Sequence, residues 1–226
     1  MEKRNYCYKE RRVSPEFGCD SITQKSQDWN LPDDAKKILQ ERFKNLKHPV
    51  VLEVFTKEKE NEEFNFYTEK FLQELSTISD KIIVHQNKVG DEISKKYNVE
   101  RSPTILLQPD DYNIRYTGAP MGEEGRSFIE ALLMVSEKNS NLSQASKDIL
   151  ATLKEPRHVQ VFVTLACPYC PAQVINAFKA AIEKQYKKNT ALNLRVPLKN
   201  ETVMAVIAVK GREGIVEGVD YRGVPV

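Results

Sequence analysis

The feature that most constrains this chain is a pair of cysteines between a strand-like and a helix-like segment. Residues 158–164 are short, β-branched and aromatic, which is typical of a strand. The motif Cys167-Pro168-Tyr169-Cys170 follows shortly after, and apolar residues in segment 171–187 then recur on one helical face. A C-x-x-C at a strand-to-helix junction predicts redox-active thiols.

This position suits thiol chemistry because the thiolate, not the thiol, is the nucleophile. A free cysteine has a pKa of about 8.5, and the N-terminus of a helix lowers it by favouring the anion. One helical turn brings the second sulfur back to the first. We therefore expect Cys167 to attack a substrate disulfide and Cys170 to resolve the mixed disulfide.

Two other interpretations of the cysteine pair stay open at this point. The pair could be part of a zinc site, or it could be two inert core thiols. Zinc needs about four ligands, and the remaining candidates have no ligand spacing to one another: His48, His85, His158, Cys7 and Cys19. We therefore predict no metal, and no cofactor beyond the redox-active cysteine pair itself.

Composition narrows the class of protein and its compartment. The 226 residues carry a formal net charge of +2, which favours neither nucleic acid nor a membrane surface as a partner. No apolar run approaches the ~18 residues of a membrane span, and residues 1–7 contain no apolar signal segment. Four cysteines are too few for a disulfide-stapled scaffold. We expect a cytoplasmic protein.

The pattern of helices and strands occurs twice along the chain. Residues 1–30 lack periodicity, and residues 1–34 form an N-terminal extension that ends in a helix start. Cys7 and Cys19 in this extension are expected to be dispensable, the alternative being an accessory thiol relay. Residues 35–141 predict one unit, and residues 142–226 predict a second. The first unit has helices at 35–46, 62–79, 90–97 and 121–136 and strands at 49–55, 81–85, 104–108 and 112–117; the second has helices at 143–153 and 171–187 and strands at 158–164, 192–196, 203–209 and 214–218.

Two stretches carry a resemblance to a known family: Arg115-Tyr-Thr-Gly-Ala-Pro-Met-Gly122 within 105–128, and 161–171 with its Cys-Pro-Tyr-Cys-Pro. The chain resembles the tandem thioredoxin-fold protein disulfide oxidoreductases, also called glutaredoxin-like proteins, and the N-terminal domain of the alkyl hydroperoxide reductase flavoprotein. The resemblance implies an α/β protein with two tandem thioredoxin-like folds. The first fold lacks cysteines, and the second carries C-P-Y-C and is altered or incomplete at its C-terminal end.

The resemblance also implies further site residues. Pro168 and Tyr169 would contact substrate, and the Ser102–Pro103 bond would be the cis-proline turn of the first fold. Two alignments are open for the second fold. Either its hairpin lies at 203–218 and no proline takes the cis position, or Pro225 is the cis-proline.

The function implied is a thiol-disulfide oxidoreductase that exchanges its dithiol with protein or small disulfides. Its partners would be disulfide-bearing proteins, with a flavoprotein reductase or glutathione as the electron donor. One alternative is an electron-transfer module that passes reducing equivalents from a flavoprotein to a peroxiredoxin. Another is a non-catalytic thioredoxin-fold adaptor.

Overall fold

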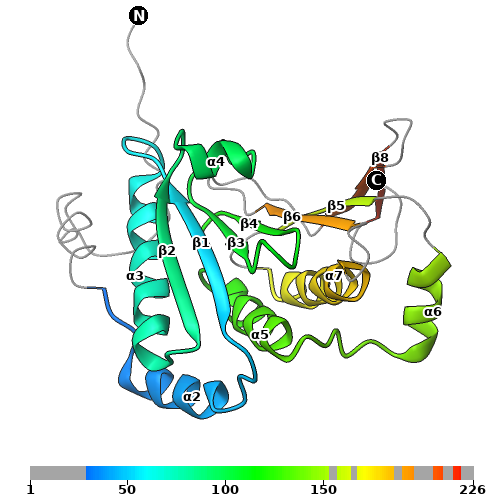
Figure 1. The fold of residues 1–226 in the computed structure, drawn as a ribbon, viewed down its shortest axis with the longest axis horizontal. Helices are drawn as coiled ribbons and strands as arrows, with labels where there is room; N and C mark the ends of the chain where they lie inside the picture. The colour runs from blue at the N-terminus through cyan, green and yellow to red at the C-terminus, as the bar shows by residue number, and fades with distance from the viewer. Residues whose placement is uncertain are drawn as a thin grey trace, which may run out of the picture.

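One mixed sheet runs through the computed structural model, which describes residues 29–152, 157–163, 167–185, 190–195, 206–210 and 216–219. Its strand order is β2-β1-β3-β4-β6-β5-β7-β8 (Figure 1). The strands are β1 (Val50–Thr56), β2 (Ile82–Lys88), β3 (Thr104–Leu107), β4 (Ile114–Thr117), β5 (Arg157–Phe162), β6 (Thr190–Arg195), β7 (Val206–Lys210) and β8 (Val216–Val219). The helices are α2 (Asp33–Phe43), α3 (Glu62–Ile78), α4 (Glu92–Lys96), α5 (Glu123–Glu137), α6 (Gln144–Thr152) and α7 (Cys170–Gln185).

The same strand pairing occurs in both halves of the sheet. In the first half β1 pairs parallel with β2 and antiparallel with β3, and β3 pairs antiparallel with β4. In the second half β5 pairs parallel with β6 and antiparallel with β7, and β7 pairs antiparallel with β8. The predicted hairpin of the second unit is therefore present as β7 and β8.

A parallel pair, β4 with β6, joins the two halves into one sheet. Tyr116 of β4 stands in register with Leu194 of β6, which in turn faces Val161 of β5. Because β4, β5 and β6 run in the same direction, their carboxyl ends meet at one edge of the sheet. The helices that follow β4 and β5 both begin at this edge.

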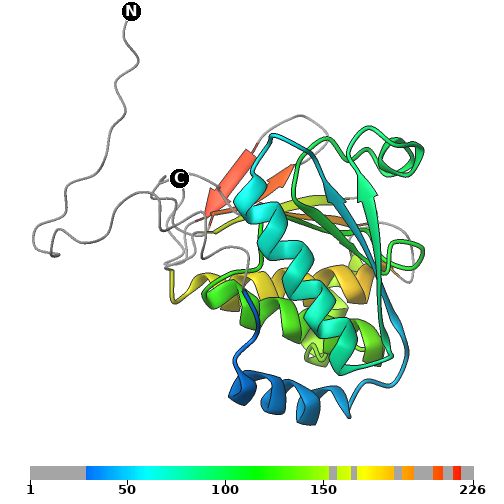
Figure 2. The ribbon, with the colours of Figure 1, turned by 90° about the vertical axis from the view of Figure 1, so that its left-hand side faces the viewer.

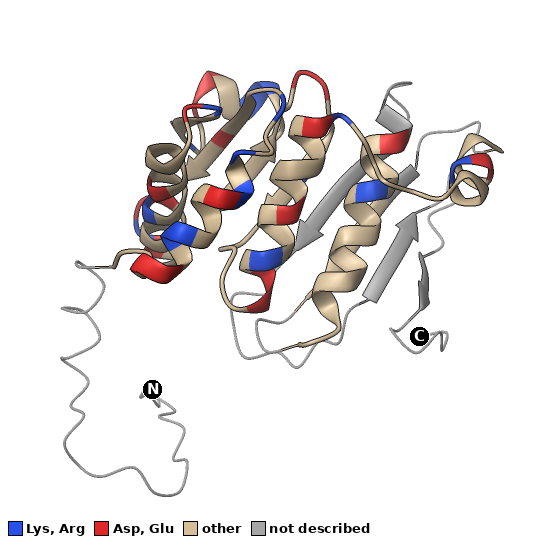
Figure 3. Ribbon diagram, turned by 90° about the horizontal axis from the view of Figure 1, so that it is seen from below, with Lys and Arg blue, Asp and Glu red and all other residues tan. Residues whose placement is uncertain are grey.

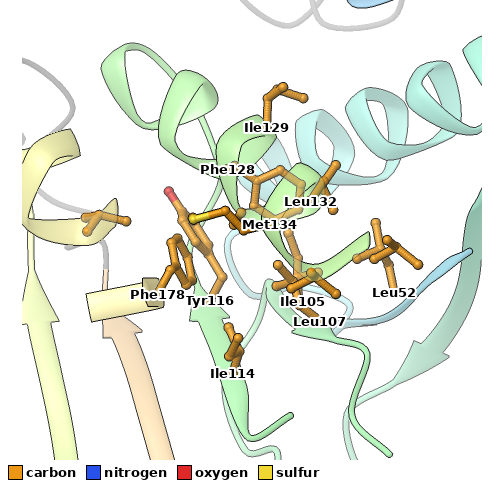
Figure 4. Close-up of a cluster of buried hydrophobic side chains, with 14 of the residues drawn as sticks. Leu52, Ile105, Leu107, Ile114, Tyr116, Phe128, Ile129, Leu132, Met134 and Phe178 are labelled. Atoms are coloured by element: carbon orange, nitrogen blue, oxygen red, sulfur yellow. The ribbon is translucent and has the colours of Figure 1, made fainter. Parts of the chain in front are cut away.

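The main core lies between the sheet and the helices α3, α5 and α7. Helix α5 packs against α7 on the same face of the sheet (Figure 3). Figure 4 shows Tyr116, Phe128 and Phe178 in this cluster, with residues of the first half and of the second half together, and all three are completely buried. The two halves therefore share one core.

A smaller core lies on the opposite face of the sheet. Phe55 and Leu106 alternate with the residues that face the main core, so they point to the other side. They pack with Val99, and Tyr97 covers them in part beside the short helix α4. In the view of Figure 3, Lys and Arg are interspersed with Asp and Glu along the helices.

The predicted elements agree with the observed ones in order and type, but boundaries differ. The first helix was predicted to end at Leu46, whereas α2 ends at Phe43. The prediction ended the second strand at His85, whereas β2 continues to Lys88. Gln86, Asn87 and Lys88 are polar because β2 is an edge strand, yet they pair with residues 54–56 of β1. None of the helices in the described part of the chain combines the length and apolar character needed to cross a membrane.

Candidate redox site

Cys167 and Cys170 form a disulfide, with their Cα atoms 5.5 Å apart. Cys170 is the first residue of α7 and is completely buried in the main core. Cys167 lies before the helix and is only partly buried, packed against the same core. The two sulfur atoms therefore differ in access, and the cysteine nearer the strand is the more accessible one.

The two residues between the cysteines face outward. Pro168 is exposed, and the side chain of Tyr169 is 60% exposed. They lie in the turn that leads into α7, at the surface beside Cys167. The contact of Pro168 and Tyr169 with substrate stays a prediction.

A buried carboxyl lies at the same edge of the sheet. Glu124 is the second residue of α5, and α5 and α7 both begin at this edge, on the left in Figure 2. Glu124 is completely buried, and Ser127 Oγ donates a hydrogen bond of 2.5 Å to Glu124 Oε2. Glu124 Oε1 is buried and has no hydrogen-bond partner in the described structure. Burial raises the pKa of Glu124 to about 7, with a smaller contribution from the charge of Glu123.

Sequence reasoning missed Glu124, although a signal for it exists. Glu124, Phe128, Ala131 and Leu132 recur at i, i+4, i+7 and i+8, so the carboxyl lies on the apolar face of the helix. A prediction that counts only apolar residues passes over it. An acidic residue in the first turn of a helix is usually solvated, and the burial of Glu124 depends on how α5 packs in the fold.

In the first half of the sheet, the region that corresponds to the Cys167–Cys170 site holds a network of hydrogen bonds between polar groups. The Ser102–Pro103 peptide bond is cis, as predicted. Ser102 Oγ donates to Asn65 Oδ1 at 2.5 Å and accepts from the backbone N–H of Lys57 at 2.9 Å. The Nδ2 group of Asn65 donates to the carbonyl oxygens of Lys57 and Glu60. The loop after β1, where a dithiol would lie, is thus bonded to the cis-proline turn.

Some predicted residues cannot be placed. Cys7, Cys19 and Pro225 lie outside the residues that the structure describes. Within the described ranges, no three His, Cys, Asp or Glu side chains are grouped so that they could hold a metal ion.

The fold and the cysteine pair define a tandem thioredoxin-like protein with a disulfide at the start of a helix. The chain is 25% identical to a protein disulfide oxidoreductase from Aeropyrum pernix K1, with a TM-score of 0.72 and 85% of this chain and 88% of that chain covered. The chain is therefore a homologue of the protein disulfide oxidoreductases. The N-terminal domain of the alkylhydroperoxide reductase AhpF from Enterococcus faecalis shares the fold at 21% identity, with a TM-score of 0.67 and coverage of 81% and 92%.

Parts of the chain are also similar to segments of longer curated proteins. The chain is 26% identical over 132 residues to an NADH dehydrogenase of Ferdinandcohnia aciditolerans, covering 54% of this chain and 25% of the relative. It is 30% identical over 76 residues to the alkyl hydroperoxide reductase AhpF of Staphylococcus epidermidis, covering 33% of this chain and 15% of the relative. The chain therefore spans a quarter or less of these relatives. No protein-family model matches it.

Proposed function

We propose that this protein catalyses thiol-disulfide exchange through Cys167 and Cys170. The observation that carries the proposal is the unequal burial of the two sulfurs at the start of α7, with Cys170 completely buried and Cys167 partly accessible. Only the accessible sulfur, that of Cys167, can attack a sulfur atom of a substrate disulfide. The buried sulfur, one turn away, can reach only its neighbour.

The reaction of the reduced protein proceeds in two balanced steps. The Cys167 thiolate attacks one sulfur of a substrate disulfide, and the other substrate sulfur leaves as a thiolate. The Cys170 thiolate then attacks Cys167 Sγ, which releases the second substrate thiolate and forms the Cys167–Cys170 disulfide. Two electrons pass to the substrate. The N–H groups at the start of α7 favour the thiolate of Cys167.

Glu124 is the candidate proton carrier for this exchange. Helices α5 and α7 pack against each other and begin at the same edge of the sheet, so Glu124 and Cys170 lie at the same end of this helix pair. A carboxyl with a pKa of about 7 can take a proton from a thiol and return it near neutral pH. Pro168 and Tyr169 would contact the substrate at the surface.

The donor and acceptor in the cell are a further part of the proposal. A flavoprotein reductase or glutathione would reduce the Cys167–Cys170 disulfide, and disulfide-bearing proteins would receive the electrons in the cytoplasm. The second candidate is an electron-transfer module that serves a peroxiredoxin. The likeness to the N-terminal domain of AhpF favours this candidate.

The test is to trap the intermediate. Cys170→Ser keeps the attacking sulfur and removes the resolving one, so we expect stable mixed disulfides on non-reducing gels. Cys167→Ser is the matched control and should trap nothing. Trapping by Cys167→Ser alone would reverse the two roles. Trapping by neither variant would leave a non-catalytic adaptor as the better account.

A further inference from the structure

Two buried polar atoms, a hydroxyl and a carboxyl oxygen, lie unpaired in the main core. One is the hydroxyl of Tyr116, and the other is Oε1 of Glu124; neither has a partner among the residues that the structure describes. Both residues are completely buried. Buried polar groups in folded proteins nearly always have a hydrogen-bond partner, because an unpaired one costs about 1–3 kcal/mol. Each of these two atoms therefore needs a partner.

The positions of the two side chains make them suitable partners for each other. The ring of Tyr116 contacts Phe128 edge to face, with ring centroids 5.6 Å apart, and Phe128 is one helical turn after Glu124 on α5. Figure 4 shows the Tyr116 hydroxyl directed toward the helical layer. Glu124 also acts electrostatically on Tyr116, where burial and this charge raise the tyrosine pKa well above its ordinary value. The two groups thus lie within electrostatic range.

We propose that one water bridges the two side chains, accepting a hydrogen bond from the Tyr116 hydroxyl and donating one to Glu124 Oε1, and so holds this carboxyl in position. The other oxygen, Oε2, already accepts from Ser127. With both donors, the carboxylate is satisfied on each oxygen. When Glu124 takes up a proton, its own O–H can donate to the same water, and the water can then donate to the Tyr116 oxygen, because a phenol both donates and accepts.

Few charged or titratable groups in the described structure act electrostatically on Glu124 or Tyr116. Glu123 acts on Glu124 from its own helix, Tyr116 faces it from β4, and Tyr67 of α3 acts on Tyr116. The hydroxyl of Tyr67 donates to the Pro120 carbonyl oxygen, 3.4 Å away. On the side of α7, Cys170 carries no charge while it is in the disulfide. Tyr116 is therefore the group whose removal should change the proton affinity of Glu124 most directly.

The role in thiol exchange rests on the proposed function, but the contact can be tested without any activity. The probe is the ¹³C signal of the Glu124 side-chain carboxyl, followed by NMR from pH 4 to pH 9 in the oxidised protein. Glu124→Gln assigns the signal. Tyr116→Phe should raise the pKa of Glu124 by about one unit or more, because the carboxylate loses a donor.

Two control variants separate this contact from general effects of repacking. Tyr112→Phe makes the same chemical change just before β4 and should leave the titration of Glu124 unchanged. Thr68→Val removes another buried hydroxyl that has no partner in the described structure. An unchanged pKa in Tyr116→Phe would overturn the proposal. So would an upward shift in Thr68→Val alone, since it would make Thr68 the donor.

Discussion

Asn61 donates a hydrogen bond from its side-chain amide to the carbonyl oxygen of Ser102, at 2.7 Å. Ser102 immediately precedes the cis peptide bond to Pro103. In a thioredoxin-like fold this turn lies against the dithiol and offers its backbone to the substrate. In the first half of this protein the chain itself occupies that carbonyl, and no cysteine lies nearby in sequence. The first half is thus closed as a redox site.

The polar network around Ser102 should stabilise the first half. Asn65 is almost fully buried and bonds to Ser102 and to two backbone carbonyls. We predict that Asn65→Ala lowers the free energy of unfolding by about 3 kcal/mol, because the buried partners lose their bonds. Urea denaturation measures the loss. Asn113→Ala, at an exposed asparagine, is the control and should cost less than about 0.5 kcal/mol. Equal losses in the two variants would contradict the role of the network.

Much of the architecture was predictable because the local signals agree with the final fold. The apolar periodicity of segments 62–79 and 121–136 predicted α3 and α5, and the β-branched runs predicted β1 and β5. The position of Cys170 at the start of α7 also followed from the sequence. These features depend on residues that are close along the chain.

The parts that could not be predicted depend on distant residues meeting. The β4–β6 pair, which joins the halves, leaves no pattern of its own in either strand. The network of Asn65 and Ser102 spans 37 residues of sequence. Glu124 is buried only because its helix packs into the folded protein, which the sequence around it does not reveal.

The buried Glu124 should make stability depend on pH. Its pKa in the folded protein is raised from 4.5 to about 7, so the folded state holds this proton more tightly than the unfolded state. The stabilisation from the bound proton is complete below pH 4.5 and is lost as the pH rises through about 7. We predict that wild type loses about 3 kcal/mol relative to Glu124→Gln between pH 4 and pH 8.

Urea denaturation of both proteins at a series of pH values measures this difference. The other titrating groups are shared by the two proteins and cancel in the comparison. If the two stability curves run parallel over this range, Glu124 is ionised in the folded state like an exposed carboxyl.

The N-terminal cysteines should be dispensable for exchange. Cys170 already supplies a resolving thiol, with its Cα atom 5.5 Å from that of Cys167. We predict that the double variant Cys7→Ser/Cys19→Ser reduces a model disulfide at the wild-type rate. Turnover with insulin measures this. A strong reduction in rate would indicate that Cys7 and Cys19 relay electrons to the dithiol.

The redox potential should lie in the glutaredoxin range. The start of α7 favours the thiolate of Cys167, which stabilises the reduced form and raises the potential. We predict ~−200 to −230 mV, above the ~−270 mV of thioredoxin. Equilibration with defined glutathione ratios, followed by quantification of free thiols, gives the value. A potential below about −270 mV would mean that the start of α7 does not stabilise the Cys167 thiolate enough to raise the potential.

Cys167 and Cys170 should catalyse disulfide exchange, and the reduction of insulin disulfides by dithiothreitol measures this catalysis. We predict that catalytic amounts of the wild-type protein accelerate this reaction and that Cys167→Ser abolishes the acceleration. The accessible sulfur is the attacking group, so no other described residue can replace it. A wild-type rate no faster than dithiothreitol alone, or full activity in Cys167→Ser, would contradict the account.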